Sequence, residues 1–356
     1  MSAPVAVVTG ASAGTGRAIS VELADRGFDV ALLARGEAGL RAAAADVEAR
    51  GRRALRLEVD VADWAQVDGA ASRVEEELGP IEVWINNAMT TVFSWSWDIE
   101  PDDYRRATEV NYLGVVHGTL AALHRMRPRD RGRIVNVGSA LGFLGIPLQA
   151  PYCASKFAVR GFSESVLAEL FNEGSNVALS QVHLPAVNTP QFDWCKALLP
   201  GRPQPVPPIY QPEVAARAVV AAAFDGRRSR VLGVWNTIIV TATRVIPGVA
   251  VHFGGISAVE GQQAEEDVDP DRPSNLHHPV DADRDFGARG RFSERSQGMF
   301  TPSFIQSMPE TASQLLDAAR ASLRHQRDRT RRTRVLRQLV DSAEDAGAGS
   351  RSGSYH

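Results

Sequence analysis

Two ionisable side chains that stand four residues apart, Tyr152 and Lys156, could carry out proton chemistry. In a helix, residues i and i+4 lie on one face a turn apart, so the lysine ammonium could sit near the phenol. A free tyrosine has a pKa of about 10, and a nearby positive charge favours the phenolate. A tyrosine tuned in this way can act as general acid or base near neutral pH. Taken alone, such a pair is more often a surface i,i+4 pair on a helix than a catalytic one.

Two further polar residues could assist such a reaction. Ser139 follows the apolar run 133–137, and its hydroxyl could donate a hydrogen bond to a substrate oxygen. It could also cap a turn. Asn111 is a polar residue among apolar neighbours in the helix-compatible segment 102–126, where a local helix hydrogen bond is the alternative.

A glycine-rich turn stands where a predicted strand becomes a predicted helix. It reads Thr9-Gly10-Ala11-Ser12-Ala13-Gly14-Thr15-Gly16. Glycines there allow a tight turn and a close backbone approach to a pyrophosphate, whose charge the N–H groups at a helix N-terminus stabilise. The turn therefore predicts a dinucleotide site that includes Gly10, Ser12, Ala13, Gly14, Thr15 and Gly16. A glycine-rich loop without a ligand is the alternative.

Polar residues also follow two other predicted strands. Asp60-Val61 closes the third strand, and Asn86-Asn87-Ala88 closes the fourth. Ligands of open parallel sheets bind beyond the carboxyl ends of the strands, where the strand order reverses. Their joint placement favours a cofactor site, although Asp60 could cap a helix and the asparagines could satisfy a turn.

Apolar runs alternate with helix-length segments over the first two thirds of the chain. The runs 5–9, 28–34, 54–59, 81–85, 133–137 and 177–182 resemble strands buried on both faces, and 231–234 could be a last strand. Helix-compatible segments lie at 15–26, 37–50, 64–78, 102–126 and 152–171. The alternation predicts an α/β fold, a parallel sheet with helices on both faces. We assign residues 1–235 to this domain and 236–356 to a C-terminal extension.

These motifs occur in the order and spacing of the short-chain dehydrogenase/reductase family, which residues 4–235 resemble. The residues that carry the resemblance are Thr9-Gly-x-x-x-Gly-x-Gly16, Asn86-Asn-Ala88, Asn111, Ser139 and Tyr152-x-x-x-Lys156. The resemblance implies a doubly wound, Rossmann-type sheet of about seven strands. It also implies hydride transfer between a nicotinamide cofactor and a carbonyl or alcohol carbon.

The resemblance further implies a role for each residue. Tyr152 would donate or accept the proton, and Lys156 would hold the nicotinamide ribose and lower the Tyr152 pKa. Ser139 would position the carbonyl, and Asn111 would support a water in a proton relay. Cofactor contacts are implied for Asp60, Val61, Asn87, Ala88, Pro185, Val187 and Thr189.

Two positions depart from the family pattern. Met89 replaces the glycine that usually follows Asn-Asn-Ala, and Ala186 replaces the glycine that often follows the proline after strand six. Both changes leave the local loop shape open, and neither removes a catalytic side chain.

The end of the second strand indicates which cofactor is preferred. Arg35 stands there, and no Asp or Glu ends that strand. An acid at this place would bind the ribose of NAD, whereas an arginine can meet a 2′-phosphate. We therefore expect NADP(H) to be preferred over NAD(H), with a solvated loop arginine as the alternative.

Aromatic and aliphatic residues follow three of the strand ends and predict an apolar substrate pocket. They are Phe93, Trp95, Trp97, Leu141, Phe143, Leu144, Phe192, Trp194, Leu198 and Leu199. Packing beneath the loops or at a subunit interface is the alternative for several of them. The expected substrate is a small apolar carbonyl or alcohol compound.

Composition restricts the partners and the compartment. The formal net charge of -3 gives no reason to expect nucleic acid, and the two cysteines form no disulfide framework or metal cluster. The N-terminus has no signal-like pattern, which favours a cytoplasmic location. By resemblance, a homodimer or homotetramer is expected, paired through the segments 102–126 and 152–171.

The extension 236–356 is the part whose role the sequence leaves open. The apolar stretch 238–253 is interrupted by Arg244 and Pro247, which disfavours a membrane span. The stretch 260–296 should be irregular, 311–343 should be an arginine-rich helix, and 347–356 should be disordered. The alternative functions are a regulator that senses NADP(H) or a scaffold in peripheral contact with a membrane surface, each acting through this extension.

Overall fold

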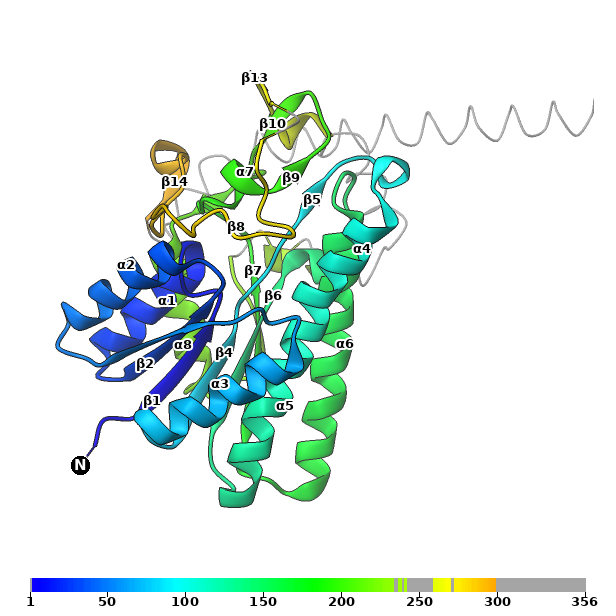
Figure 1. Cartoon of the computed structure of the whole chain (residues 1–356). Coiled ribbons are helices and arrows are strands. Elements are labelled where there is room, and N and C mark those ends of the chain that lie inside the picture. Colours follow the sequence, from blue (N-terminus) through cyan, green and yellow to red (C-terminus); the bar gives the residue numbers. More distant parts are fainter. Residues whose placement is uncertain (1, 234–235, 239, 242–258, 270–271, 299–356) are drawn as a thin grey trace, which may run out of the picture. The chain divides into compact units, whose positions relative to one another are not determined.

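The computed structural model describes residues 2–233, 236–238, 240–241, 259–269 and 272–298. Seven parallel strands form the central sheet in the order β12-β7-β6-β4-β1-β2-β3 (Figure 1). Their bounds are β1 Val5–Thr9, β2 Asp29–Ala34, β3 Ala54–Glu58, β4 Ile81–Asn86, β6 Arg133–Ser139, β7 Ala178–Leu184 and β12 Ser229–Val231. The predicted fold class, a parallel α/β sheet of about seven strands, is therefore confirmed.

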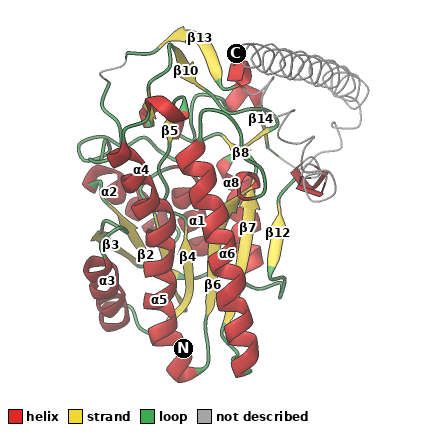
Figure 2. Cartoon of the chain, turned by 90° about the vertical axis from the view of Figure 1, so that its right-hand side faces the viewer, coloured by secondary structure: helices red, strands yellow, loops and turns green. Residues whose placement is uncertain are grey.

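Helices cover both faces of the sheet. The helices α1 Gly14–Asp25, α2 Glu37–Glu48 and α8 Pro212–Ala222 pack on one face, and α3 Trp64–Glu77, α5 Gly114–Met126 and α6 Ala150–Glu173 on the other (Figures 1 and 2). Along β1 the side chains alternate between the two cores. Ala6 and Val8 join the core beneath α1, α2 and α8, while Val5 and Val7 join the opposite core. This explains why the strand is apolar throughout rather than alternating.

The strand order reverses beside β1. After β1 the chain builds outward through β2 and β3, and it then crosses back to place β4 on the other side of β1. The loops that leave the carboxyl ends of β1 and β4 therefore diverge at this point. Such a switch point is where open α/β sheets bind their ligands.

One predicted helix is interrupted in the structure. The segment 102–126 forms α4 Pro101–Thr108, a π-helical turn at Glu109–Leu113, and α5. The N–H group of Gly114 donates to the carbonyl of Glu109, five residues earlier. A π turn inserts an extra residue into the helix, and such turns are frequent at functional sites. Asn111 lies within it.

Short strands and one short helix lie over the carboxyl ends of the sheet. They are β5 Val92–Phe93, β8 Ala186–Val187, α7 Gln191–Trp194, β9 Lys196–Ala197, β10 Gly201–Pro203, β11 Ile209–Tyr210, β13 Gln263–Asp267 and β14 Ser296–Gln297. The last two come from the predicted extension: β13 pairs with β10, and β14 pairs with β11. The described part of the extension thus contacts the sheet domain.

The remaining expectations for the extension fall mostly outside the described residues. They are the apolar stretch 238–253, apart from residues 238 and 240–241, the arginine-rich helix 311–343 and the end 347–356. Among the residues that the structure describes, no helix has the length and apolar character needed to cross a membrane.

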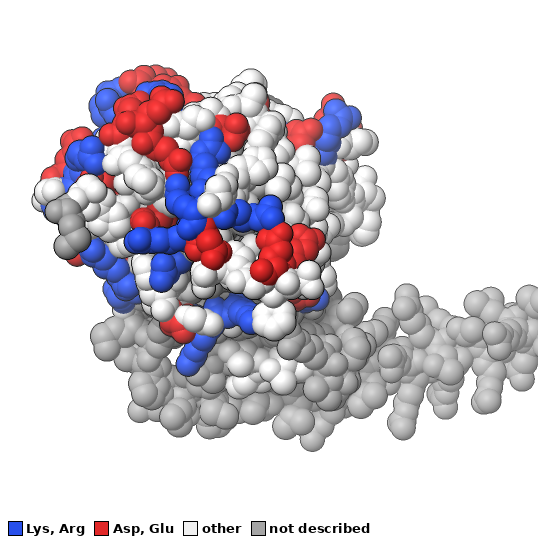
Figure 3. Space-filling view, turned by 90° about the horizontal axis from the view of Figure 1, so that it is seen from below, with Lys and Arg blue, Asp and Glu red and all other residues white. Residues whose placement is uncertain are grey.

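Basic and acidic side chains are intermixed on the face seen from below (Figure 3). Examples of such pairs are Arg129 with Glu75 of α3 at 2.7 Å and Arg131 with Glu82 of β4 at 3.0 Å. Because water and salt screen such partly exposed pairs, each contributes only about 0–1 kcal/mol to stability.

Candidate active site

The glycine-rich turn joins β1 to α1 at the switch point. Gly10 has a φ of +66°, in the left-handed region that favours glycine. A Cβ added to Gly16 would lie 2.0 Å from the carbonyl oxygen of Gly10, which no real side chain tolerates. The N-cap residue of α1, Ala13, has no side-chain acceptor, so another group must satisfy this helix end.

Asn87 fixes the turn against the end of β4. Its side-chain Nδ2 donates to the carbonyl oxygen of Thr9 at 3.1 Å. The Thr9 hydroxyl in turn accepts the N–H groups of Asn87 and Ala88 at 2.9 and 3.1 Å. The motifs after β1 and β4 therefore form one hydrogen-bonded unit.

Ser139, Tyr152 and Lys156 meet at the end of β6. The Ser139 side chain hydrogen-bonds the Tyr152 hydroxyl and also accepts the N–H of Leu141 at 3.1 Å. The Lys156 Nζ lies 5.5 Å from the centroid of the Tyr152 ring and donates to the carbonyl of Val137 at 2.9 Å. Lys156 is only 3% exposed, so the alternative of a pair on the protein surface is excluded.

The acid–base properties of this group differ from the expectation in one respect. Burial raises the pKa of Tyr152 to about 12, although the hydrogen bond with Ser139 opposes the shift. Burial also lowers the pKa of Lys156 to about 8. The pKa of Tyr152 is therefore raised and not lowered as expected, because loss of solvation outweighs the stabilisation of the phenolate. Tyr152 is protonated at neutral pH and can donate a proton.

Asn111 contacts the loop after β4 rather than the catalytic group. Its Oδ1 accepts the N–H of Thr90 at 2.7 Å, and its Nδ2 donates to the Thr90 carbonyl at 2.9 Å. The side chain is fully buried. The two bonds fix the path of the backbone next to Met89, and the part that Asn111 was expected to take in a proton relay stays a prediction.

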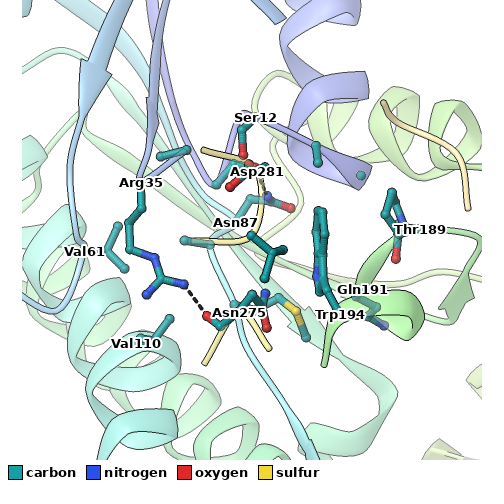
Figure 4. A pocket seen from close by; sticks show the side chains of 18 of the residues that line it. Ser12, Arg35, Val61, Asn87, Val110, Thr189, Gln191, Trp194, Asn275 and Asp281 are labelled. Carbon is teal, nitrogen blue, oxygen red and sulfur yellow. Dashed lines mark hydrogen bonds between the residues drawn. The ribbon is translucent and has the colours of Figure 1, made fainter. Parts of the chain in front are cut away.

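A first pocket opens beside the glycine turn (Figure 4). Its lining contains most of the predicted cofactor residues: Gly10, Ser12, Ala13, Gly14, Thr15, Arg35, Asp60, Val61, Asn87, Ala88 and Thr189. Gly16 does not line the pocket itself; it follows the lining residue Thr15 in the first turn of α1. Backbone and side chains from the ends of β1, β2, β3 and β4 thus surround a single elongated site.

A second pocket continues from the first. Thr15, Asn87, Met89, Thr189 and Gln191 line both of them. The second pocket also contains the predicted catalytic residues Ser139, Tyr152 and Lys156 and the predicted cofactor residues Pro185 and Val187. The tyrosine hydroxyl is therefore placed in the pocket that adjoins the dinucleotide pocket.

The apolar residues predicted to surround a substrate divide into two groups. Phe93, Leu141, Leu144 and Phe192 line the second pocket, joined by Ile146 and the segment 205–208. The others have different places. The rings of Trp95 and Trp97 stack with their centroids 5.2 Å apart, and the ring of Phe143 packs on His183. Leu199 belongs to a buried core cluster, whereas Leu198 is 41% exposed. Trp194 lines the first pocket.

The two departures from the family pattern lie in the pocket walls. Met89 lines both pockets, so its side chain stands where they join. Ala186 begins β8, which pairs in parallel with β11, and it lines the second pocket. Both substitutions therefore affect the shape of the site, while the side chains predicted to be catalytic are all present.

The end of β2 is covered by a segment that the sequence did not assign to the site. The Arg35 guanidinium donates to the carbonyls of Asn275, Leu276 and His277. Asn275, Val280 and Asp281 belong to the lining of the first pocket. No spacing rule connects residue 35 with residues 275–281, because these contacts form only when the extension folds over the sheet.

Comparison with known proteins agrees with this geometry. The family model described as short chain dehydrogenase matches residues 4–194, more than half of the chain. The chain is 34% identical over 228 residues to 3-dehydrosphinganine reductase of Danio rerio, covering 62% of this chain and 68% of that protein.

Two solved structures are similar in fold. An alcohol dehydrogenase from Thermococcus sibiricus, complexed with 5-hydroxy-NADP, has a TM-score of 0.56 and 26% identity, covering 64% of this chain and 95% of that one. A short chain dehydrogenase from Mycobacterium paratuberculosis, bound to NAD, has a TM-score of 0.56 and 25% identity, covering 65% of this chain and 96% of that one. The chain belongs to the short-chain dehydrogenase/reductase family and is an NAD(P)-dependent oxidoreductase.

Proposed function

We propose that this chain transfers a hydride between NADP(H) and the carbonyl or alcohol carbon of an apolar substrate, with Tyr152 as general acid or base. One observation carries the proposal: Tyr152 and Lys156 line the second pocket, which joins the first through Thr15, Asn87 and Thr189. A dinucleotide bound along the first pocket would extend its nicotinamide end toward the tyrosine.

The residues present fit such a cofactor. The turn around Gly10 and Gly16 is a cradle that a Cβ would fill, and it opens at the start of α1. Ser12, Asp60 and Val61 would hold the adenosine end, and Asn87, Thr189 and Lys156 the nicotinamide end. The bound nicotinamide supplies or accepts the hydride.

The chain's own side chains would then handle the oxygen and its proton. In the reducing direction Ser139 would donate a hydrogen bond to the substrate oxygen once its bond to Tyr152 gives way. Tyr152, which is protonated at neutral pH, would give its proton to that oxygen as the carbon receives the hydride. The ammonium of Lys156 would stabilise the phenolate left behind. In the oxidising direction each transfer is reversed.

The substrate would be apolar. Phe93, Leu141, Leu144, Ile146 and Phe192 contribute to the wall of the second pocket. The similar reductase from Danio rerio is named for 3-dehydrosphinganine, which supports a carbonyl compound as the substrate class. A screen of apolar ketones and aldehydes, followed by the loss of NADPH absorbance, tests the proposal. Absence of turnover with every carbonyl, despite tight NADPH binding, would contradict it.

Arg35 supports the preference for NADP(H). It follows β2 and lines the first pocket, and within the described residues its Nη1 and Nη2 donate to three backbone carbonyls. A guanidinium has five N–H donors, so it retains capacity for a 2′-phosphate.

Substitution Arg35→Ala should weaken NADPH binding about tenfold to a hundredfold and NADH binding by less than about threefold. A hydrogen bond to a charged group is worth roughly 1.5–3 kcal/mol, and only NADPH carries the 2′-phosphate. Calorimetric titration with both cofactors measures the difference. Arg41→Ala is the matched control, because Arg41 is in α2 and pairs with Glu37 away from the pocket. Equal losses for both cofactors in Arg35→Ala would refute the preference.

The outer surface of α5 and α6 supports a homodimer. The two helices lie side by side on the face turned toward the viewer in Figure 2. Leu113, beside α5, and Leu120, Phe157 and Phe171, within α5 and α6, are each at least 36% exposed. Two-fold pairing would bury these side chains. Light scattering at micromolar concentration should therefore give at least twice the mass of one chain, and Leu120→Asp should lower it. A monomer in the unmodified protein would exclude this assembly.

A further inference from the structure

A segment of the C-terminal extension crosses the dinucleotide pocket, and we call residues 272–292 the strap. Its beginning is held by Arg272, which donates to the carbonyls of Asp193 and Cys195 at 2.9 and 2.8 Å. Its end is held by Phe292, whose N–H donates to Oδ1 of Asn188 at 3.0 Å. Between these anchors Leu276 is fully buried. The strap is therefore a packed part of the domain.

The strap satisfies the ends of both helices that begin at the pocket. The N–H of Gly14, at the start of α1, donates to the carbonyl of Gly287 at 3.0 Å. The N–H groups of Ala38 and Gly39, in the first turn of α2, donate to the carbonyls of Ala282 and Asp281 at 3.0 and 3.2 Å. These bonds place the strap's residue 281 at the N-terminus of α2.

The carboxylate of Asp281 lies deep between α2 and the glycine turn. A Cβ added to Gly36 would lie 1.9 Å from its Oδ1, and one added to Gly39 would lie 2.7 Å from its Oδ2. The same Cβ on Gly39 would lie 2.8 Å from the Cβ of Ser12. Only glycines at positions 36 and 39 leave room for this acid. Asp281 is 7% exposed and lines the first pocket beside Ser12 (Figure 4).

Side chains of both charges meet at this end of the pocket. Arg35 is turned toward the carbonyl of Asn275 (Figure 4), and its charge interacts with the carboxylates of Asp60 and Asp281. Asp60 is itself paired with Arg106. Asp281 thus brings an additional negative charge to the place where β2 ends without an acid of its own.

We propose that Asp281 is a specificity-determining residue that reads the 2′ position of the adenosine ribose. The inference rests on the proposed dinucleotide site. An acid at this end of the pocket accepts a hydrogen bond from a ribose hydroxyl and repels a 2′-phosphate. The positive charge of Arg35 has the opposite effect, because it attracts a 2′-phosphate. The ratio of NADP(H) to NAD(H) affinity is therefore set by two side chains of opposite charge, Arg35 and Asp281. The acid comes from the strap instead of from the end of β2.

Asp281→Asn tests this assignment, because it removes the charge and keeps the size. We expect NADPH to bind at least about tenfold more tightly and NADH a few times more weakly, since one partner loses a repulsion and the other an acceptor. The 2′ position is examined alone with adenosine 2′,5′-bisphosphate and adenosine 5′-monophosphate as probes. The affinity for the bisphosphate should rise and that for the monophosphate should not.

Asp285→Asn is the matched control within the strap. Asp285 pairs with Arg17, so its loss loosens the strap without removing a carboxylate from the pocket lining. Its ratio of NADPH to NADH affinity should stay within about twofold of the unmodified protein. An unchanged ratio in Asp281→Asn, or the same change in both variants, overturns the inference alone. Failure of the unmodified protein to bind either cofactor overturns the proposed function and this inference with it.

Discussion

Replacement of Tyr152 by phenylalanine should remove nearly all turnover while leaving NADPH affinity almost unchanged. Only the phenolic oxygen is lost, so the ring keeps its packing. Lys156 stays in place, because its Nζ is held by the carbonyl of Val137. General acid–base catalysis contributes roughly 10²–10⁴-fold in rate, and the loss should be of that order. Single-turnover hydride transfer with a substrate found by the carbonyl screen measures the effect.

The control for this variant is Tyr104→Phe. Tyr104 is in α4, and its hydroxyl donates to the carbonyl of Ser96 at 3.1 Å, outside both pocket linings. The chemical change is identical, so its rate should stay within about twofold of the unmodified enzyme. If Tyr152→Phe retained more than about a tenth of the rate, the expected contribution of acid catalysis would be absent and another group would be the proton donor.

Gly16→Ala should cause the second large effect, the loss of cofactor binding. The added Cβ would lie 2.0 Å from the Gly10 carbonyl oxygen and 2.6 Å from Nδ2 of Asn87. The turn must then move away from α1, and the hydrogen bond from Asn87 to Thr9 must stretch. Forcing a methyl group into a packed site costs roughly 1–3 kcal/mol, which corresponds to a loss of about fivefold to more than a hundredfold in affinity.

Gly161→Ala provides the comparison for this experiment. Gly161 is also within a helix, α6, but nothing lies within 4 Å of the Cβ that would be added. Titration with NADPH and thermal unfolding of both variants separate a local change in the turn from a general loss of stability. Equal NADPH affinity in the two variants would show that the turn does not approach the cofactor as closely as proposed.

Much of the fold follows from local patterns. Each strand of the sheet centre is a short apolar run, since a parallel strand covered on both faces contacts apolar side chains on each side. The glycine turn was predictable because Gly10 needs a left-handed φ and Gly16 lacks space for a side chain, and both requirements show directly in the residue type. The pair Tyr152 and Lys156 was predictable for a similar reason, since helix geometry alone places residues four apart on one face.

Other features depend on contacts that no local pattern encodes. The π turn at Glu109–Leu113 has no residue type that marks it in the sequence, and its extra residue accompanies the two bonds between Asn111 and the distant Thr90. The direction of the Tyr152 pKa shift follows from how deeply its hydroxyl is buried, which neighbouring elements decide. The sequence indicated Lys156 as the charge near Tyr152, but it could not show how much solvation the tyrosine hydroxyl loses on folding.

The sequence by itself determined the class of the protein and predicted the proposed catalytic group and the glycine-rich turn, because each depends on residue types at fixed short spacings. The tertiary structure alone decided how the adenosine end of the pocket is built. There, Arg35 meets the carbonyls of residues 275–277, and Asp281 fits against Gly36 and Gly39. These contacts join positions about 240 residues apart. They form when the distant segment folds over the sheet and its carbonyls accept the N–H groups of Ala38 and Gly39 at the start of α2.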